Sequence, residues 1–506
     1  MTFACAHRGD SSKFRENTIA GIQSAITAGA EIVEIDLRIS RDGEVIVSHD
    51  YTLERMWGLS DDVGNRDWSE IARLGEGDLR IPLLSDVLKL FVGTSSTLMI
   101  DMEQADPAAG AFAVVQSGPL SQDQITWCGH LEGMRTIRSL SASARIWMPW
   151  DEVAIPTHAD ISELNPEFIN LNYSFVDQEC VKAIHELGCK VSVWTIQDEA
   201  TMRWAAAIGV DSITTDYLSK LQDVLATNPK LAADPPQSCT IEDIDVEQAM
   251  EVARELGRWS AMVCRFMAPG ELQLKQNPAD IVTVVDLMIE KHVREVISAN
   301  FPGHNFVGEE FGGSYAADTP SWYLDPVDGT TNFANGMPWS SFSLALAHNR
   351  TPLLGVVTDP WREKIFEAQA GKGAMCNGQP LVIEVQSAEN PLSSRIVATE
   401  LASYQPWPGM LSLLDQLAEN FCTMRIMGSG TLTLAGVAAN QSVGAVVGHF
   451  SPIDHLAACL IVHEAGGVVL DERGEVNLFP ESGGILCATK AAAKPLYEIW
   501  MKAVTF

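Results

Sequence analysis

Basic residues are scarce in this sequence. Its 506 residues include 34 Lys and Arg against 66 Asp and Glu, which gives a formal net charge of −32 at pH 7. This excess of negative charge repels nucleic acids and anionic membranes, so neither is expected as a partner. It would also repel a phosphate ester, unless bound divalent metal reverses the sign of the local field. Acidic clusters are therefore candidates for metal sites, while ordinary solvated surface accounts for most of the Asp and Glu.

The sequence also has no apolar run long enough to cross a bilayer, and no basic-plus-apolar signal segment opens it. Ten cysteines are scattered without a Cys-x-x-Cys pair, which is typical of reduced thiols and argues against a disulfide framework or a zinc site. We therefore expect a cytoplasmic protein without a membrane span. Its length allows two or three domains, each with its own core.

The rest of the chain is organised around residues 322–333, Trp-Tyr-Leu-Asp-Pro-Val-Asp-Gly-Thr-Thr-Asn-Phe. An apolar strand leads into two carboxylates, Asp325 and Asp328, and Pro326 keeps Asp325 extended. Such a pair suits Mg²⁺, which prefers a few carboxylates together with phosphate and water. Gly329 permits close backbone approach, and the amides that follow it can open a helix whose N-terminus receives a phosphate. An Asp-rich turn with an Asp N-cap would produce the same local pattern.

Three further segments accompany this one along the chain, two before it at residues 275–286 and 308–310 and one after it at residues 453–467. They contain Lys…Asp-x-Val-Thr-x-x-Asp, Gly-Glu-Glu and Ile-Asp…Glu-Ala-Gly-Gly. Together the four segments resemble the signatures of the inositol monophosphatase family of Mg²⁺-dependent phosphatases, over about residues 240–490. The resemblance implies a layered α/β/α/β/α sandwich that removes phosphate from a phosphomonoester by in-line attack of water.

The same resemblance implies roles for individual residues. Two or three Mg²⁺ ions would be bound by Glu309, Asp325, Asp328, Asp454 and the carbonyl of Val327. The attacking water would be oriented by Thr330 and Asp286. Phosphate or substrate would contact Lys275, Gly329, Thr331 and Ser429. Taken alone, Asp454 would be read as the N-cap of a helix.

Two positions depart from the pattern of that family. Val447 stands where the family has its inositol-contacting Glu, and Ile453 replaces a Trp. We therefore expect a polyol pocket that differs from the inositol pocket or binds inositol differently. Related members act on histidinol phosphate, nucleotide 3′-phosphates or sugar phosphates, and the sequence leaves the choice among these open.

The first 220 residues alternate between strand and helix patterns. Strands are expected over residues 3–7, 31–39 and 45–49, and apolar spacing predicts a helix over residues 19–26. The strand at 31–39 alternates so cleanly that its charged side chains share one face, which suggests the lumen of a barrel near its mouth. These charged residues are Glu34, Asp36 and Arg38.

Two histidines, His7 and His49, stand at strand ends with two carboxylates between them. Such a set can perform acid–base chemistry beside a metal, although a single strand-end histidine is more often structural. His-Arg-Gly at residues 7–9, Glu-Asn-Thr at 16–18, Glu-x-Asp and His-Asp together resemble the glycerophosphodiester phosphodiesterase family, over about residues 3–220. The resemblance implies a TIM-like (β/α)₈ barrel.

By this resemblance His7 and His49 would be the acid–base pair, Arg8 would hold the phosphate, and Trp194 would line the mouth of the pocket. Catalytic residues of such barrels lie at the carboxyl ends of the strands. One divalent cation, Mg²⁺ or Ca²⁺, would be bound by Glu34, Asp36 and Asp101.

The strand at residues 98–103 departs from this second family, which usually shows Glu-x-Lys there. Asp101 takes the Glu position with a shorter reach, and Glu103 takes the Lys position. Alternation predicts that both side chains point into the lumen. A cation that would help to hold the phosphate is then replaced by an anion, which predicts an altered or weakened activity. Residues 55–80 are expected to contact the substrate.

Residues 218–242 contain Asn-Pro and Pro-Pro dipeptides, which are typical of a semi-rigid linker. A helix with apolar spacing is expected from about residue 243 to 267. The predicted organisation is a barrel at residues 1–225, a linker at 226–242 and a phosphatase-like domain at 243–506.

We therefore expect a bifunctional hydrolase of small-molecule phosphate esters. The barrel would cleave a glycerophosphodiester or sugar phosphodiester to a phosphomonoester, and the second domain would dephosphorylate an inositol phosphate or sugar phosphate. Glycerophosphoinositol fits both families, and a sugar–phosphate–sugar diester of the opine type fits the altered pockets better. Alternatively, only the phosphatase is catalytic and the barrel is a binding or regulatory module, or the two domains act on unrelated substrates. The phosphatase family is often dimeric, so a homodimer is expected.

Overall fold

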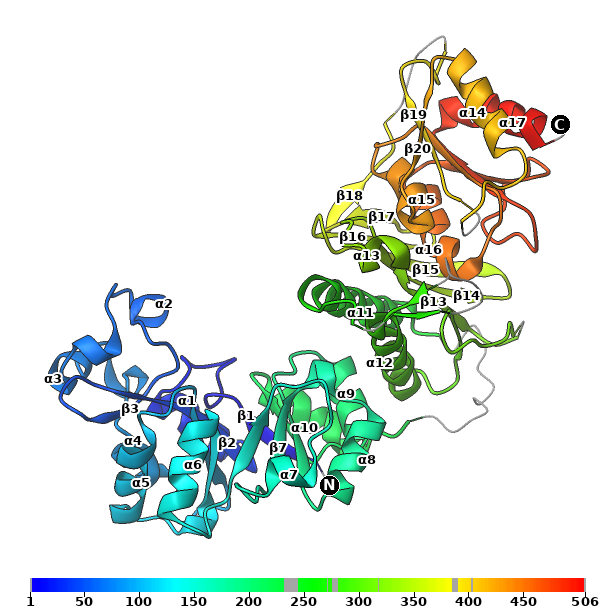
Figure 1. The fold of residues 1–506 in the computed structure, drawn as a ribbon. Coiled ribbons are helices and arrows are strands. Elements are labelled where there is room, and N and C mark those ends of the chain that lie inside the picture. The colour runs from blue at the N-terminus through cyan, green and yellow to red at the C-terminus, as the bar shows by residue number, and fades with distance from the viewer. Residues whose placement is uncertain are drawn as a thin grey trace. The chain divides into compact units, whose positions relative to one another are not determined.

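The computed structural model describes residues 2–231, 244–270, 272–274, 281–316, 318–384, 390–401 and 404–504. The chain divides into two compact units, Met1–Leu231 (unit 1) and Ala232–Phe506 (unit 2), coloured blue to green and green to red in Figure 1. Most of the expected linker and Lys275 lie outside the described residues. None of the helices in the described ranges combines the length and apolar character that crossing a membrane requires.

Unit 1 is a nearly closed barrel of parallel strands (Figure 1). The strands follow the order β5-β4-β2-β1-β9-β8-β7-β6, and a parallel bridge from Trp127 to Ile146 joins the two ends of this row. Their bounds are β1 (Phe3–Ala6), β2 (Ile32–Ile39), β4 (Thr97–Met102), β5 (Ile125–Gly129), β6 (Trp147–Trp150), β7 (Phe168–Asn172), β8 (Lys190–Trp194) and β9 (Ser212–Thr215). This is the TIM-like barrel that the sequence predicted.

Helices connect the strands of the barrel. They are α1 (Ile19–Thr27), α4 (Leu84–Leu90), α5 (Ala108–Ser117), α6 (Leu131–Leu140), α7 (His158–Ile161), α8 (Gln178–Glu186), α9 (Glu199–Ala207) and α10 (Leu218–Ala226), with 3-10 turns η3 (Gln122–Gln124) and η4 (Tyr173–Phe175). The start of the expected linker, residues 218–226, is therefore helical. Leu218, Leu221 and Val224 of α10 are buried, which fixes the helix on the barrel.

An insertion follows β2 in unit 1. It begins with β3 (Val45–Val47), which pairs antiparallel with β2 outside the main row of strands. The short elements α2 (Glu54–Trp57), η1 (Val63–Asn65), α3 (Trp68–Ile71) and η2 (Gly77–Leu79) complete it. Leu53, Val63 and Ile71 form a small core of their own with neighbouring apolar residues, so the insertion is a packed structure and not an open loop.

Unit 2 contains two large sheets and a small pair, β10 (Gln273–Leu274) with β11 (Ile281–Val282). The larger sheet comprises β12 (Asn305–Gly308), β13 (Ser321–Asp328), β14 (Ser341–His348), β15 (Thr351–Asp359), β16 (Lys364–Gln369), β17 (Gly373–Cys376) and β18 (Gln379–Leu381), in that order. The smaller sheet has the order β20-β19-β21-β23-β22. Its strands are β19 (Ile396–Thr399), β20 (Thr423–Ile426), β21 (Gly444–Val447), β22 (Val468–Asp471) and β23 (Ile485–Ala488), and β19, β20 and β21 are parallel.

Helices separate and cover these two sheets (Figure 1). The helices α11 (Val246–Phe266) and α12 (Val284–Asn300) pack on the larger sheet, and α14 (Met410–Glu419) and α17 (Lys490–Val504) pack on the smaller. Between the sheets lie α15 (Gly430–Ala438) and α16 (Pro452–Glu464), and the short α13 (Thr330–Ala334) follows β13. The result is the predicted α/β/α/β/α layering. Because α16 has a sheet on each side, residues 455–462 are all buried.

Candidate active sites

The two histidines predicted as the acid–base pair of the barrel each face a carboxylate. His7 follows β1, and its Nδ1 lies 2.7 Å from Oδ1 of Asp216, which follows β9. Asp216 also accepts hydrogen bonds from Ser11 Oγ at 2.9 Å and from Gln197 Nε2 at 2.6 Å. Burial raises the pKa of Asp216, but His7 and the two donors outweigh burial and the pKa is lowered. An ionised Asp216 holds the Nδ1 proton of His7 and leaves Nε2 to exchange a proton with a ligand.

His49 is held in the same way. Its Nδ1 lies 2.7 Å from Oδ1 of Asp50, and Arg55 Nε donates to Oδ2 of Asp50 at 2.5 Å. Arg55 also bridges to Glu16, with Nη2 2.5 Å from Oε1. The hydrogen bond from Arg55, assisted by His49 and opposed by burial, lowers the pKa of Asp50 to about 2. Among the described residues, Glu16, His49 and Asp50 lie close enough to share a cation, and the Arg55 guanidinium supplies positive charge there.

The three carboxylates predicted to bind a cation in the barrel are brought together. Glu34 and Asp36 lie on β2, and Asp101 pairs in register with Asp36 from β4. The backbone N–H of Arg8 donates to Glu34 Oε2 at 2.7 Å, and Arg8 Nε lies 3.2 Å from Asp36 Oδ2. Burial, then the charges of Asp36 and Asp101, raises the pKa of Glu34 well above its ordinary value. Burial, then Asp36, raises the pKa of Asp101 to about 7. The Arg8 guanidinium faces these three carboxylates, which are hard oxygen donors that suit a divalent cation, although their ligand oxygens do not all lie within 4.8 Å of one another in this structure.

Glu103, at the position where the family shows Lys, lies just past the end of β4. The strand ends at Met102, and the Glu103 side chain is 62% exposed. It pairs with Nη2 of Arg38, whose own side chain is only 5% exposed. Nε and Nη1 of Arg38 have no acceptor among the described residues. The anion at the Lys position is therefore neutralised by a buried cation from β2.

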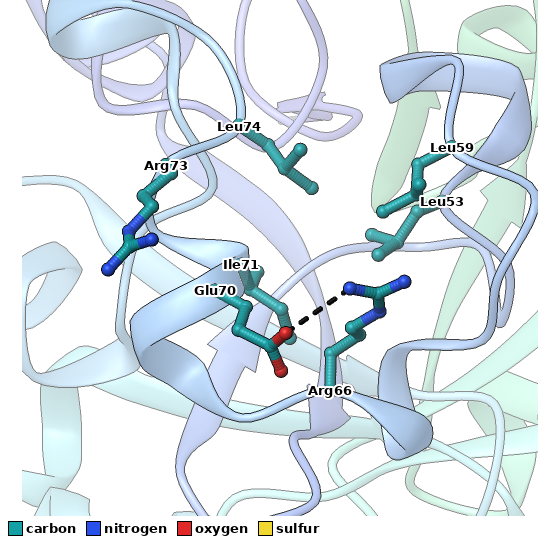
Figure 2. A pocket seen from close by; sticks show the side chains of 7 residues that line it. All are labelled: Leu53, Leu59, Arg66, Glu70, Ile71, Arg73 and Leu74. Carbon is teal, nitrogen blue, oxygen red and sulfur yellow. Dashed lines mark hydrogen bonds and ion pairs between the residues drawn. The ribbon is translucent and has the colours of Figure 1, made fainter.

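The structure also describes Trp194 and the insertion at residues 55–80. Trp194 ends β8, and 37% of its surface is exposed, as expected for a residue at the mouth. The insertion at residues 55–80 contains a pocket of about 230 Å³ (Figure 2). Figure 2 shows the Arg66–Glu70 ion pair on one side of this pocket and leucine side chains on the other. The pocket is lined by Leu53, Leu59, Arg66, Glu70, Ile71, Arg73 and Leu74.

In unit 2 the two central aspartates lie at the end of β13. A bulge falls between Asp325 and Asp328. Without it, residues three apart would point to opposite faces of the sheet. Asp325 is 3% exposed and accepts a hydrogen bond from the backbone N–H of Val327 at 2.9 Å. Asp328 accepts from Ser429 Oγ at 2.5 Å and from the Thr431 backbone N–H at 2.7 Å, so the start of α15 fixes its position.

The predicted water-orienting pair is also assembled. Thr330 Oγ1 lies 3.1 Å from Asp286 Oδ1 and 3.0 Å from the carbonyl oxygen of Val327. Asp286 is in the first turn of α12 and closes a capping box with Thr283. Burial raises the pKa of Asp286 to about 6, with Thr283 acting against it and the charge of Glu309 acting with it. One hydroxyl therefore links the carbonyl of Val327, a predicted metal ligand, to a buried carboxylate.

Glu309 follows β12 and is positioned by a residue that the sequence motifs did not indicate. Glu290 on α12 is fully buried and accepts hydrogen bonds from the backbone N–H groups of Glu310 at 2.7 Å and Phe311 at 3.0 Å. A Cβ on Gly308 would lie 1.9 Å from Glu290 Oε1, so only glycine admits this carboxylate. Glu290 thus fixes the loop that carries Glu309.

Asp454 lies in the first turn of α16, whose N-cap is Ser451, so Asp454 is not the cap that its sequence position alone suggested. The backbone carbonyl of Asp454 accepts a hydrogen bond from Thr431 Oγ1 at 2.5 Å. Burial raises the pKa of Asp454 to about 7, with His455 lowering it and the other carboxylates raising it. Next to it, His455 Nε2 lies 3.0 Å from Oε1 of Glu400.

The chemistry of this donor set suits Mg²⁺, although no three of its carboxylates have ligand oxygens all within 4.8 Å of one another among the described residues. Burial is the main cause that raises the pKa of Asp325 well above its ordinary value, and the charges of Glu309, Asp328 and Asp454 add to it. Four of the carboxylates have no lysine or arginine partner among the residues that the structure describes: Asp286, Asp325, Asp328 and Asp454. Carboxylates crowded together away from water are costly to keep ionised, and hard divalent cations relieve that cost.

The predicted phosphate contacts are only partly described. Gly329 has φ 89 and precedes α13, and a Cβ there would lie 2.9 Å from the Gly428 carbonyl oxygen, so glycine is needed. Thr331 lies in α13, and Ser429 is the N-cap of α15. Lys275 is among residues 275–280, which are not described.

Several positioning residues were missed by the reading of the sequence. The available signals were the place of Asp216 directly after a strand and the place of Arg55 five residues after Asp50. Glu400 carries no local signal, and Glu290 shows only its spacing of four residues from Arg294, because the groups that they position lie elsewhere in the fold.

Comparison with known proteins matches a family model to each half of the chain. The model of the inositol monophosphatase family matches residues 244–503, and that of the glycerophosphoryl diester phosphodiesterase family matches residues 7–220. Inositol monophosphatase 1 of Homo sapiens is 32% identical over 251 residues, which cover 48% of this chain and 86% of the human protein. Inositol monophosphatase 2 of Solanum lycopersicum is 32% identical over 263 residues, 50% of this chain and 97% of the tomato protein. A solved Thermotoga maritima IMPase is 26% identical and covers 51% of this chain and 98% of its own, with a TM-score of 0.45.

Proposed function

Because the chain belongs to the inositol monophosphatase family and carries a glycerophosphoryl diester phosphodiesterase domain ahead of that region, we propose that it is a bifunctional phosphoric ester hydrolase. Unit 1 cleaves a phosphodiester to a phosphomonoester, and unit 2 removes the remaining phosphate. The two family domains imply these two reaction classes, and their fusion makes the first product a natural substrate for the second site.

The phosphatase half of the proposal rests on one observation. Buried carboxylates without a lysine or arginine partner among the described residues gather beside a threonine–aspartate pair, Thr330 and Asp286. Two or three Mg²⁺ ions would be held by Glu309, Asp325, Asp328, Asp454 and the Val327 carbonyl, and would supply Lewis acidity for attack on phosphorus. Asp286 and Thr330 hold and orient the attacking water, because Asp286 accepts a proton that Thr330 Oγ1 directs toward it.

The diesterase half rests on the two carboxylate-held histidines. Nε2 of one ring protonates the leaving alkoxide, and Nε2 of the other accepts a proton from the attacking group. Asp216 and Asp50 hold the Nδ1 protons, which fixes the tautomers that these roles need. Arg8 binds the phosphate, and Glu34, Asp36 and Asp101 would hold one Mg²⁺ or Ca²⁺ that neutralises developing charge.

The substrate class of the proposal is a glycerophosphodiester or a sugar phosphodiester, followed by an inositol phosphate or sugar phosphate. Position 447 is a fully buried valine, which supplies no carboxylate to an inositol ring. A diester of two sugars therefore fits the altered pockets better than glycerophosphoinositol does.

Phosphate release in the presence of Mg²⁺ tests the proposal. Monoesters and diesters are assayed separately on the wild type, on Asp328→Asn and on Asp415→Asn, a matched control at an exposed position of α14. We expect the wild type and the control to release phosphate from both panels. We expect Asp328→Asn to stop at the monoester, because the site loses a carboxylate ligand while the barrel is intact. A protein that releases no phosphate from any diester that it cleaves would sink the sequential scheme.

A second candidate is that unit 1 binds its ligand without turnover. The Arg38–Glu103 ion pair at the mouth favours this reading, because the cation at that place is already engaged. His7→Ala separates the two candidates, with His158→Ala on α7 as the matched control. Loss of diester cleavage in His7→Ala alone supports catalysis by the barrel. Equal cleavage in both variants identifies the barrel as a binding module.

Other parts of the proposal concern the whole chain. We propose a barrel at 1–225, a linker at 226–242 and a phosphatase domain at 243–506, joined for sequential action. Cutting the linker near Pro235 and comparing the overall flux at low enzyme concentration tests whether the fusion matters. The described cysteines are free, which supports a reducing, cytoplasmic compartment. Sedimentation tests the proposed homodimer.

A further inference from the structure

The smaller sheet of unit 2 places a carboxylate beside the phosphatase site that none of the assigned roles uses. Ligands of α/β sheets bind at the carboxyl ends of parallel strands. Three such ends lie together in the order β20-β19-β21. Glu400 follows the central strand, Ser429 and α15 follow β20, and Val447 ends β21.

Glu400 is held at one oxygen and open at the other. His455 is 2% exposed, and its Nδ1 accepts a hydrogen bond from the Ser451 backbone N–H at 3.0 Å. The ring proton is therefore on Nε2, which donates to Glu400 Oε1 at 3.0 Å. Oε2 of Glu400 accepts no hydrogen bond within the described part of the chain. It lies against Gly430, where a Cβ would be 1.9 Å from it.

Glu400 belongs to the same site as the metal-binding carboxylates. Its Oε2 lies against Gly430, whose backbone N–H donates to Asp328 Oδ1 at 3.2 Å, and its partner His455 is the residue next to Asp454. Its side chain is 19% exposed, whereas Asp325 is 3% exposed, so Glu400 lies on the solvent side of the carboxylate set. An anion in this place repels the phosphate group and therefore faces the alcohol part of the ester.

We propose that Glu400, held by His455, selects phosphomonoesters whose alcohol part carries a hydroxyl or ammonium group near the ester oxygen. This deepens the proposed function and rests on unit 2 being a phosphatase. The free oxygen accepts a hydrogen bond from that group, and the fully buried Val447 supplies no such acceptor. The site discriminates against an analogue that lacks this hydroxyl or ammonium group. When such an analogue binds, the carboxylate of Glu400 loses water without gaining a hydrogen bond.

Binding of phosphonates, which cannot be hydrolysed, tests the assignment directly. Propylphosphonate, 3-hydroxypropylphosphonate and 3-aminopropylphosphonate are titrated calorimetrically against the full chain with Mg²⁺. We expect the wild type to bind the hydroxyl or the amino compound about tenfold or more tightly than propylphosphonate. Whichever of these two compounds binds more tightly shows whether Glu400 prefers a hydroxyl or an ammonium group. Glu400→Gln should bring the amino preference to within about threefold, because the amide oxygen carries no charge.

Matched variants keep the test decisive. Glu419→Gln, at an exposed position on the same unit, should keep the wild-type preference. Glu400→Asp keeps the charge beside Asp328 and shortens the reach, so it should also lose the preference, and it replaces Glu400→Gln if that variant fails to fold. Equal binding of the three phosphonates to the wild type, or a preference that persists in Glu400→Gln and Glu400→Asp, would overturn the assignment.

The failure of this inference can be told apart from failure of the proposed function. Phosphate release is measured from ethyl phosphate, 2-hydroxyethyl phosphate and 2-aminoethyl phosphate with Mg²⁺. If none of these or other monoesters reacts, unit 2 is not a phosphatase and the inference falls with it. If phosphate is released but the phosphonates are not distinguished, only the role of Glu400 is lost.

Discussion

At the scale of single residues, the carboxylate behind each histidine decides what the ring can do. Asp216→Asn places an amide beside His7 Nδ1, and its NH₂ group can donate where the carboxylate only accepted. The ring then carries its proton on Nε2, which is the wrong tautomer for a base. We expect kcat/KM for diesters to fall about 100-fold or more, with little change in Tm. Diester kinetics over pH check this.

Asp223→Asn, at an exposed position on α10, is the control for that experiment. Its diester kinetics should match the wild type. If Asp216→Asn also stays within about threefold of the wild type, Asp216 does not set the tautomer of His7.

A second residue, Arg55, controls how unit 1 responds to acid. The pKa of Asp50 is lowered from 3.8 to about 2, chiefly by Arg55. A carboxyl group whose pKa is lowered by folding stabilises the fold at pH values above its unfolded pKa. That stabilisation is lost as the pH falls through the pKa of the folded state. Arg55→Gln should lower the free energy of unfolding by about 1 kcal/mol between pH 7 and pH 5, after allowance for the exposure of Arg55 to solvent. The cost should shrink between about pH 4 and pH 2. Thermal unfolding followed over pH measures this, and a cost that does not change with pH would contradict it.

At the scale of elements, the contact between α12 and β12 positions Glu309. Gly308→Ala would put a Cβ 1.9 Å from Glu290 Oε1 and force the helix or the loop to move. We expect a loss of about 1–3 kcal/mol in the free energy of unfolding, because overpacking a buried site is costly. Mg²⁺ affinity should also weaken, since Glu309 follows β12 directly. Thermal unfolding with and without Mg²⁺, together with phosphate release, checks both effects.

The control for that prediction is Gly64→Ala in η1, where a Cβ meets nothing within 4 Å. It should leave stability and Mg²⁺ affinity unchanged. Should Gly308→Ala behave like this control, Glu290 would have room to move and would not fix the loop that carries Glu309.

Helices and strands with strong local sequence signals were the elements predicted correctly from the sequence. Strands such as β13 and helices such as α12 were predicted because apolar periodicity and capping residues are local signals. The ion pair of Glu103 with Arg38 was not predicted, because it joins β2 to the end of β4, two strands that only the fold brings side by side. The helix α10 was read as the start of a linker, because nearby prolines outweighed its buried leucines.

At the scale of the whole molecule, the net charge of −32 opposes an anionic substrate. Salt screens this repulsion, so raising NaCl from about 20 to about 200 mM at saturating Mg²⁺ should lower KM for phosphate monoesters about twofold. Repeating the series with sodium glutamate separates screening from specific anion binding. A KM that rises with both salts would mean that local positive charge at the sites dominates the overall field.

The sequence by itself determined the two families, the order of the two units and most of the residues expected at each site. Those signals lie in short motifs, such as His7-Arg8-Gly9 and Asp325-Pro326-Val327-Asp328, whose spacing survives in a linear chain. Only the tertiary structure decided which groups orient them, because Asp216, Glu290 and Glu400 are distant in sequence from the residues they contact. Such pairings depend on the register of strands and the approach of helices, and these are set by packing across the whole unit and not by any local pattern.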